Sequence, residues 1–302
     1  MSIMNIEWKE QHIKNPTVLK PAIGYLHRSA QFPALVANSL LPKQDDDSHT
    51  SLEWVPDLKS LVSKPIKLDA VVRVALHYEK YELHFLNDTF QAVSILPLTG
   101  QTRSQVMGYL KQTVAKLGGD RDAIKPIDHY ELPPHETDNK GVYQVTNPEH
   151  HREMMRYRTN IRVILEALKP HFKNTSDIAV WPHHFDTGMT IDVATNDKKE
   201  VTKSIGLGLA VPDELSPEPY FYINHKWKGG KIKYDDLTNL PGGGSWVGEN
   251  NPMAILRMSQ ILKRDDVAQQ KRQITHFFEE GINFSLELIK APELKMESET
   301  TV

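Results

Sequence analysis

Three closely spaced strands are encoded by residues 70–96, which read AVVRVALHYEKYELHFLNDTFQAVSIL. From residue 81 to residue 85, apolar side chains (Tyr81, Leu83, Phe85) alternate with polar ones (Glu82, His84). Because successive side chains of a strand point to opposite faces, this alternation is typical of a sheet with one covered face. The sequence therefore predicts antiparallel strands at 70–76, 81–86 and 90–96.

Helical patterns flank these strands. Thr102 and Gln105 have the spacing of a capping box, and the apolar stripe that follows ends at Gly118. A second stripe of helical period begins after Pro148 and runs to about Lys169. At the N-terminal end, Pro21 and Pro33 interrupt the apolar pattern of residues 17–41, so we expect a broken helix there.

The order helix, strands, helix occurs a second time along the chain. Further strands are predicted at 52–55, 178–180, 187–194, 204–211 and 219–225, and further helices near 252–263 and 266–290. We therefore expect an α+β fold with duplicated halves related by a pseudo-two-fold seam. The first half would span residues 1–120, a crossover linker residues 121–146, and the second half residues 147–302, packed as one globular unit.

Composition narrows the classes of partner. The 302 residues carry 36 Lys plus Arg against 39 Asp plus Glu, a formal charge of −3, which gives no general attraction to nucleic acid or to an anionic membrane. No apolar run approaches the roughly 18 to 20 residues that span a bilayer. The N-terminus shows no secretory signal, so we expect a cytoplasmic protein. Without cysteine, a metal site would need His, Asp or Glu.

The most unusual segment is WPHHFDTG, residues 181–188. It places His183, His184 and Asp186 within four residues, at a point where a strand is expected to bend. Imidazoles and a carboxylate can bind a divalent metal or act as an acid–base pair. We therefore predict His184 and Asp186 as catalytic residues, and all three as ligands of a divalent metal.

Two readings of this segment are open. In a regular strand His183 and His184 would point to opposite faces, so that they could not bind the same ion, whereas a bulge or turn near Pro182 would re-aim either ring. In the alternative reading the segment has no functional role: His183 is a hydrogen-bonded core residue, and His184 and Asp186 lie on a solvent-exposed surface. A metal site would also need a further ligand from elsewhere in the chain, since such sites take three or four.

Other polar and aromatic residues are candidates for a ligand pocket, which is usually apolar with a few placed polar groups. His49 follows the first helix, in the position that the His183 segment occupies in the second half. The predicted ligand-binding set is His49, Trp54, Trp181, His183, Tyr220, Tyr222, His225 and Trp246. The alternative reading of the aromatic residues is ordinary core, because large aromatic side chains dominate burial in any fold.

Four stretches carry a family resemblance: WPHHFDTG (181–188), SIGLGLA (204–210), PYFYINHKW (219–227) and LPGGGSWVG (240–248). With them, the chain resembles a bacterial family of uncharacterised proteins, a domain of unknown function of the "five-nine-nine-six" type. In this resemblance Leu26 and His27 look like the first helix element, His49 like the histidine after it, and Asp186 like the aspartate of the second half, while Pro219–Tyr222 resembles the aromatic strand.

This chain also departs from the family pattern. Ser48, Thr50 and Ser51 surround His49 where the family has a pair of tryptophans, and His183–His184 replaces Gly-Ser. The resemblance implies a shared architecture and a shared site region, and it implies no reaction.

Two classes of function follow from these patterns. The first is a small-molecule-binding protein, or a metal-dependent hydrolase or isomerase, with a His/Asp/aromatic pocket at the seam between the halves. The second is a non-catalytic interaction module in which the histidines are structural. A homodimer is compatible with both. The sequence lacks the serine-hydrolase, zincin and kinase motifs, which argues against those three classes.

Overall fold

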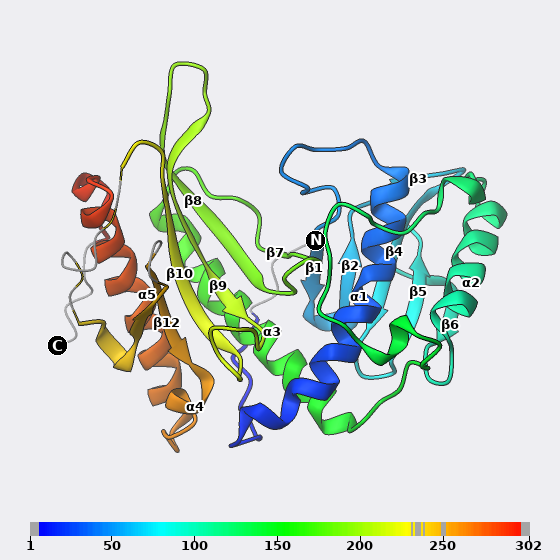
Figure 1. Cartoon of the computed structure of the whole chain (residues 1–302), viewed down its shortest axis with the longest axis horizontal. Helices are drawn as coiled ribbons and strands as arrows, with labels where there is room; N and C mark the ends of the chain where they lie inside the picture. The colour runs from blue at the N-terminus through cyan, green and yellow to red at the C-terminus, as the bar shows by residue number, and fades with distance from the viewer. Residues whose placement is uncertain (1–5, 231, 233–236, 238, 249–251, 297–302) are drawn as a thin grey trace. The chain divides into compact units, whose positions relative to one another are not determined.

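The computed structural model describes residues 6–230, 232, 237, 239–248 and 252–296, and it has the α+β architecture that the sequence predicts. Helices cover antiparallel strands throughout the described part (Figure 1). No helix within these residues is long and apolar enough to cross a membrane.

The chain folds into two compact units that interleave along the sequence. Unit 1 consists of residues 1–6, 19–159 and 179–185, and unit 2 consists of residues 7–18, 160–178 and 186–302. The predicted crossover linker, residues 121–146, thus lies wholly inside unit 1. Its Tyr143 is buried and exchanges backbone hydrogen bonds with Gly100 and Gln101, which ties the segment to the loop before α2. The compact units therefore differ from the predicted halves, and the duplication stays a prediction.

In unit 1 the strands follow the order β7-β1-β2-β4-β5-β6, with β3 also paired to β4. Within the described residues, β1 pairs with β2 and β7, β4 with β2, β3 and β5, and β5 with β6, each in antiparallel orientation. The strands are β1 (Leu52–Val55), β2 (Ser60–Ser63), β3 (Ile66–Lys67), β4 (Val71–His77), β5 (Glu82–Leu86), β6 (Ala92–Pro97) and β7 (Ala179–Val180). The strands predicted within residues 70–96 are confirmed.

Helix α1 (Lys20–Leu40) is continuous, so the expectation of a broken helix was wrong. Pro21 lies in the first turn, where proline is tolerated, and only Pro33 lies inside the helix. An internal proline costs about 3 kcal/mol or more. Burial of the α1 face that includes Tyr25, Leu26 and Leu35, in contact with β2 and β4, offsets this cost.

The remaining helices of unit 1 are α2 (Arg103–Lys116) and the first part of α3 (Pro148–Leu168), whose second part belongs to unit 2. The predicted capping box of α2 is confirmed, because the Thr102 hydroxyl accepts from the Gln105 backbone and Gln105 Oε1 accepts from the Thr102 backbone. Short 3₁₀ turns occur at Pro16–Leu19, Pro56–Leu58, Arg121–Ala123, Glu136–Asp138 and Lys169–His171.

Unit 2 has an antiparallel sheet in the order β11-β12-β10-β9-β8, against which α5 packs. Its elements are β8 (Thr187–Thr195), β9 (Val201–Ala210), β10 (Tyr220–Trp227), β11 (Ser245–Val247), β12 (Met253–Arg257), α4 (Met258–Ile261) and α5 (Val267–Leu288), with 3₁₀ turns at Pro241–Gly243 and Pro292–Leu294.

The helix expected over residues 252–263 was wrong. Residues 253–257 form β12, and only the single turn of α4 is helical. Ala254, Ile255 and Leu256 are fully buried, and β12 is paired on both sides, with β10 and β11. A strand buried on both faces has a continuous apolar run, which periodicity does not distinguish from a buried helix.

Candidate functional site

The predicted site residues are divided between the two units, and each group is described within its own unit. His49, Trp54, Trp181, His183 and His184 belong to unit 1, whereas Asp186, Tyr220, Tyr222, His225 and Trp246 belong to unit 2.

The His183–His184 segment is a turn between strands, which settles the open question of its local geometry. β7 ends at Val180 and β8 begins at Thr187. The Phe185 backbone adopts a left-handed conformation with φ 59°, and its N–H donates to the Trp181 carbonyl over 2.6 Å. The turn leaves His184 exposed and His183 half-buried.

Phe185 anchors this turn. Its buried ring is stacked on the His27 imidazole, with centroids 4.8 Å apart, and the Arg158 guanidinium lies 4.4 Å from the ring centroid. Arg158 is fully buried and donates to the Phe185 carbonyl over 2.6 Å. The turn is therefore held by side chains of α1 and α3 that the sequence analysis did not single out for a site.

Two side chains of α1 also hold the Pro182 carbonyl. His27 Nε2 and Gln31 Nε2 each donate to this oxygen over 2.8 Å. Burial lowers the pKa of His27 to about 4, so its imidazole is neutral at pH 7 and carries its proton on Nε2. The family resemblance compared Leu26 and His27 with the first helix element, and the contacts of His27 in unit 1 are those of a positioning residue.

The turn lies beside the segment that sequence analysis took for a linker. The His183 ring lies 4.4 Å from the His184 ring and 5.7 Å from the Tyr130 ring, measured between centroids. Tyr130 in turn contacts the His129 ring edge-on at 4.9 Å, and Trp181 lies 6.0 Å from His183. We call His129, His183 and His184, joined by Tyr130, the imidazole row.

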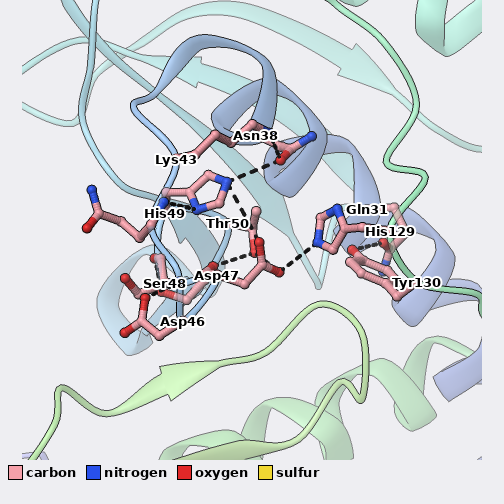
Figure 2. A network of polar contacts seen from close by, with 12 residues as sticks. Gln31, Asn38, Lys43, Asp46, Asp47, Ser48, His49, Thr50, His129 and Tyr130 are labelled. Atoms are coloured by element: carbon pink, nitrogen blue, oxygen red, sulfur yellow. Dashed lines mark hydrogen bonds and ion pairs between the residues drawn. The ribbon is translucent and has the colours of Figure 1, made fainter. Parts of the chain in front are cut away.

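His49 connects to the row through a carboxylate (Figure 2). Asp47 lies between two imidazoles, with Oδ2 at 3.1 Å from His129 Nε2 and Oδ1 at 3.7 Å from His49 Nε2. His49 Nε2 also lies 3.2 Å from Asn38 Oδ1, and His49 Nδ1 accepts from the Gln44 backbone. Both nitrogens of the buried His49 ring are thus engaged, and burial lowers its pKa.

A cavity of about 290 Å³ adjoins the row within unit 1. From α1 it is lined by Arg28, Gln31, Phe32 and Leu35. Residues 121–146, the predicted linker, contribute Ile127, Tyr130, Glu131, Leu132, Asp138 and Tyr143. Arg103 comes from α2.

Tyr130 and Gln31 belong to both the cavity wall and the surroundings of the row. The Tyr130 hydroxyl donates to Gln31 Oε1 over 2.8 Å, and Gln31 Nε2 holds Pro182. Burial raises the pKa of Tyr130, and the charge of Asp47 adds to the effect, so the hydroxyl keeps its proton at neutral pH. The cavity and the WPHHFDTG turn are therefore linked by direct hydrogen bonds.

The described part of the chain contains no cluster of side chains that could bind a metal ion. Among those residues, no group of three or more His, Asp or Glu side chains is placed to hold an ion. The predicted ligands also belong to different units, since His183 and His184 lie in unit 1 and Asp186 in unit 2.

In unit 2, Asp186 is buried and accepts a hydrogen bond from the Tyr222 hydroxyl over 2.6 Å. Burial and this carboxylate raise the pKa of Tyr222 well above its ordinary value. Tyr220 donates to Asp213 over 2.7 Å. Gly188 gives the Tyr222 hydroxyl its space, because a Cβ at Gly188 would lie 2.5 Å from that oxygen.

His225 and Trp246 form a second contact in unit 2. Their rings are stacked at 5.9 Å, and His225 Nε2 donates to the Ser285 hydroxyl of α5 over 2.7 Å, while that hydroxyl donates to the Gly281 carbonyl. Burial lowers the pKa of His225 to about 4. These contacts tie β10 and β11 to α5.

Trp54 is a core residue of unit 1. It is 3% exposed, its ring packs on Tyr78 and its indole N–H donates to Thr159. This environment matches the core reading of the aromatic residues, and it leaves Trp54 no open space for a ligand.

None of the residues that line the cavity was among the site residues predicted from the sequence. Arg28 and Gln31 lie one helical turn apart on α1, and the adjacent ring pair His129–Tyr130 stands out in an otherwise polar segment. Both signals are visible in the sequence, but only the path of residues 127–143 across α1 gives them a common location.

Comparisons with family models, with curated proteins and with solved structures found no match for this chain. The resemblance to the bacterial family consequently stays a prediction.

Proposed function

We propose that this chain is a small-molecule-binding protein whose ligand lies in the unit 1 cavity, beside the imidazole row. A volume of about 290 Å³ suits a ligand of metabolite size, since small-molecule sites typically begin near 300 Å³. Phe32, Leu35 and Ile127 give the cavity an apolar side, and the hydrogen-bonded pair Tyr130–Gln31 gives it a polar one.

One observation carries the proposal: Tyr130 belongs at once to the cavity wall and to the imidazole row. A ligand in the cavity would contact a tyrosine whose ring touches His129 and His183. Neutral imidazoles both donate and accept hydrogen bonds, so the row also suits acid–base chemistry on such a ligand. Hydrolysis or isomerisation at this position stays a prediction.

The metal-dependent form of the proposal has weaker support. It rests on His183, His184 and Asp186 as ligands, and it would require a cluster that the described residues do not form. Elemental analysis of the purified protein, together with the His184→Ala and Asp186→Ala variants, tests it directly. The interaction module also stays an alternative, which predicts that no small molecule acts through the cavity.

A cavity-filling variant tests the binding proposal. Ile127 is half-buried in the cavity wall, and Ile127→Trp would fill the space with an indole. Ile95→Trp is the matched control, because Ile95 is 49% exposed on β6 and does not line the cavity. In a thermal-shift screen of metabolites, we expect compounds that stabilise the wild type and Ile95→Trp and have no effect on Ile127→Trp.

The size of the shift follows from mass action. A ligand at 100 times its Kd stabilises the folded state by about 2.7 kcal/mol, which a melting curve resolves. The proposal fails if no compound stabilises the wild type, or if each active compound stabilises Ile127→Trp equally.

A further inference from the structure

Four charged side chains line the unit 1 cavity, and two of them already neutralise each other. Arg28 Nη2 donates to Asp138 Oδ2 over 2.8 Å and also donates to the Pro133 carbonyl. The same Asp138 oxygen accepts from the His135 backbone over 3.0 Å. Because these two side chains already pair with each other, neither lacks a counter-charge.

The other two charges are Arg103 and Glu131. Within the part of the chain that the structure describes, neither side chain forms a hydrogen bond or an ion pair with another residue, although both line the cavity. Both side chains are exposed. The cavity therefore presents one cation and one anion to whatever enters it.

Part of the cavity wall near these charges is apolar. Phe32 and Leu35 of α1 contribute one part of the wall, and Ile127 and Leu132 contribute another. Phe32 and Leu35 are each 2% exposed, so this side of the wall is rigid core. A fitting ligand needs an apolar body as well as groups for both charges.

We propose that the cavity binds a zwitterion of the α-amino-acid class with an apolar side chain; this rests on the function proposed above. The carboxylate pairs with Arg103, whose guanidinium suits the geometry of a carboxylate, and the ammonium group pairs with Glu131. The side chain packs against Phe32, Leu35 and Ile127. Binding changes no covalent bond and transfers no proton.

The charge pattern distinguishes this class from simpler ligands. A monocarboxylate would leave Glu131 without a counter-charge, and a phosphate ester would bring two negative charges near Glu131 and Asp138. An amine without a carboxylate would leave Arg103 without a counter-charge. Only a ligand with both charges gives each of the two residues a counter-charge.

The test measures binding to the full chain by calorimetry with L-leucine and L-phenylalanine. Each has two matched derivatives: the amide, which lacks the carboxylate, and the N-acetyl form, which lacks the ammonium group. We expect both amino acids to bind and each derivative to bind at least tenfold more weakly. Equal binding of an amino acid and either derivative would overturn the proposal.

Two substitutions assign the charges to residues. Arg103→Gln should weaken amino-acid binding at least tenfold and leave the weak binding of the amide unchanged, because the amide has no carboxylate to lose. Glu131→Gln should also weaken amino-acid binding at least tenfold. It should leave the weak binding of the N-acetyl form unchanged, because that form has no ammonium group to pair with Glu131. Arg121→Gln is the control, since Arg121 is exposed and lies outside the cavity. An Arg103→Gln protein that binds leucine as the wild type does would contradict the assignment.

The outcomes separate this inference from the function on which it rests. If neither amino acid binds, but another compound stabilises the wild type and not Ile127→Trp, the binding function stands and the zwitterion is excluded. If no compound acts through the cavity, both are excluded.

Discussion

Phe185 determines the local structure of the turn that carries His183 and His184. Its ring lies between an imidazole and a guanidinium, and its carbonyl accepts from the same buried Arg158 that contacts the ring. The backbone there has a φ of 59°, a conformation that costs a residue with a side chain roughly 1–2 kcal/mol. The ring contacts offset that cost.

Two substitutions of Phe185 separate the contribution of its ring to stability from that of its left-handed backbone. Phe185→Ala should reduce the free energy of unfolding by about 3–5 kcal/mol, because it leaves a cavity between His27 and Arg158. Phe185→Gly loses the same ring but relieves the left-handed backbone, so we expect it to be as stable as Phe185→Ala or more stable. Denaturant unfolding measures both. A glycine variant about 1 kcal/mol less stable than the alanine variant, as at ordinary positions, would contradict this account.

Strands β8, β9 and β10 approach one another more closely than side chains would normally allow. A Cβ built on Gly208 would lie 2.1 Å from the Thr187 carbonyl, and one on Gly206 would lie 2.3 Å from Asn224 Oδ1. Gly206 and Gly208 alternate with Ile205, Leu207 and Leu209, so one face of β9 has no side chains there. Atoms of the neighbouring strands take that space.

A matched pair of glycine substitutions tests this packing. Gly208→Ala should destabilise the protein by about 1–3 kcal/mol, because its methyl group would meet the backbone of β8. Gly108→Ala, in α2, should stabilise it by about 0.5–1 kcal/mol, since no atom lies within 4 Å of the added Cβ and glycine is unfavourable inside a helix. Melting temperatures that shift in the same direction would contradict this reading.

Acid should destabilise both units through buried histidines. The pKa of His27 in unit 1 and that of His225 in unit 2 are each lowered to about 4 by burial, against about 6.5 in an unfolded chain. Between pH 6.5 and pH 4 the unfolded chain therefore binds protons that the folded chain does not. Stability must fall as the pH falls through this window.

Melting temperatures at pH 7 and pH 5 measure this effect. Down to pH 5 each histidine should account for about 1–2 kcal/mol of lost stability. His27→Gln and His225→Gln keep a side-chain donor without a titrating group, and the double variant should have a flatter pH profile than the wild type. A double variant with an unchanged profile would assign the acid sensitivity to other groups, of which His77, whose pKa burial also lowers to about 4, is the first candidate.

The α+β class, the strands within residues 70–96 and the capped start of α2 could all be predicted from the sequence. Each depends on short-range patterns, namely the alternation along a strand and the Thr102–Gln105 pair at a helix start. The continuity of α1 through Pro33 and the strand β12 could not be predicted, because burial against other elements outweighs local propensity at both places.

For the candidate site, the unusual residue types can be read from the chain directly, in particular the adjacent His183 and His184 and the neighbouring Trp181. Their partners depend on how distant segments fold together. Residues 129–143, which read as a linker, cross α1 and bring Tyr130 to both the cavity and His183, whereas Asp186 and Tyr222 pair inside unit 2. A local pattern constrains the backbone over a few residues, while a cavity requires side chains from segments as far apart as Gln31, Arg103 and Tyr130.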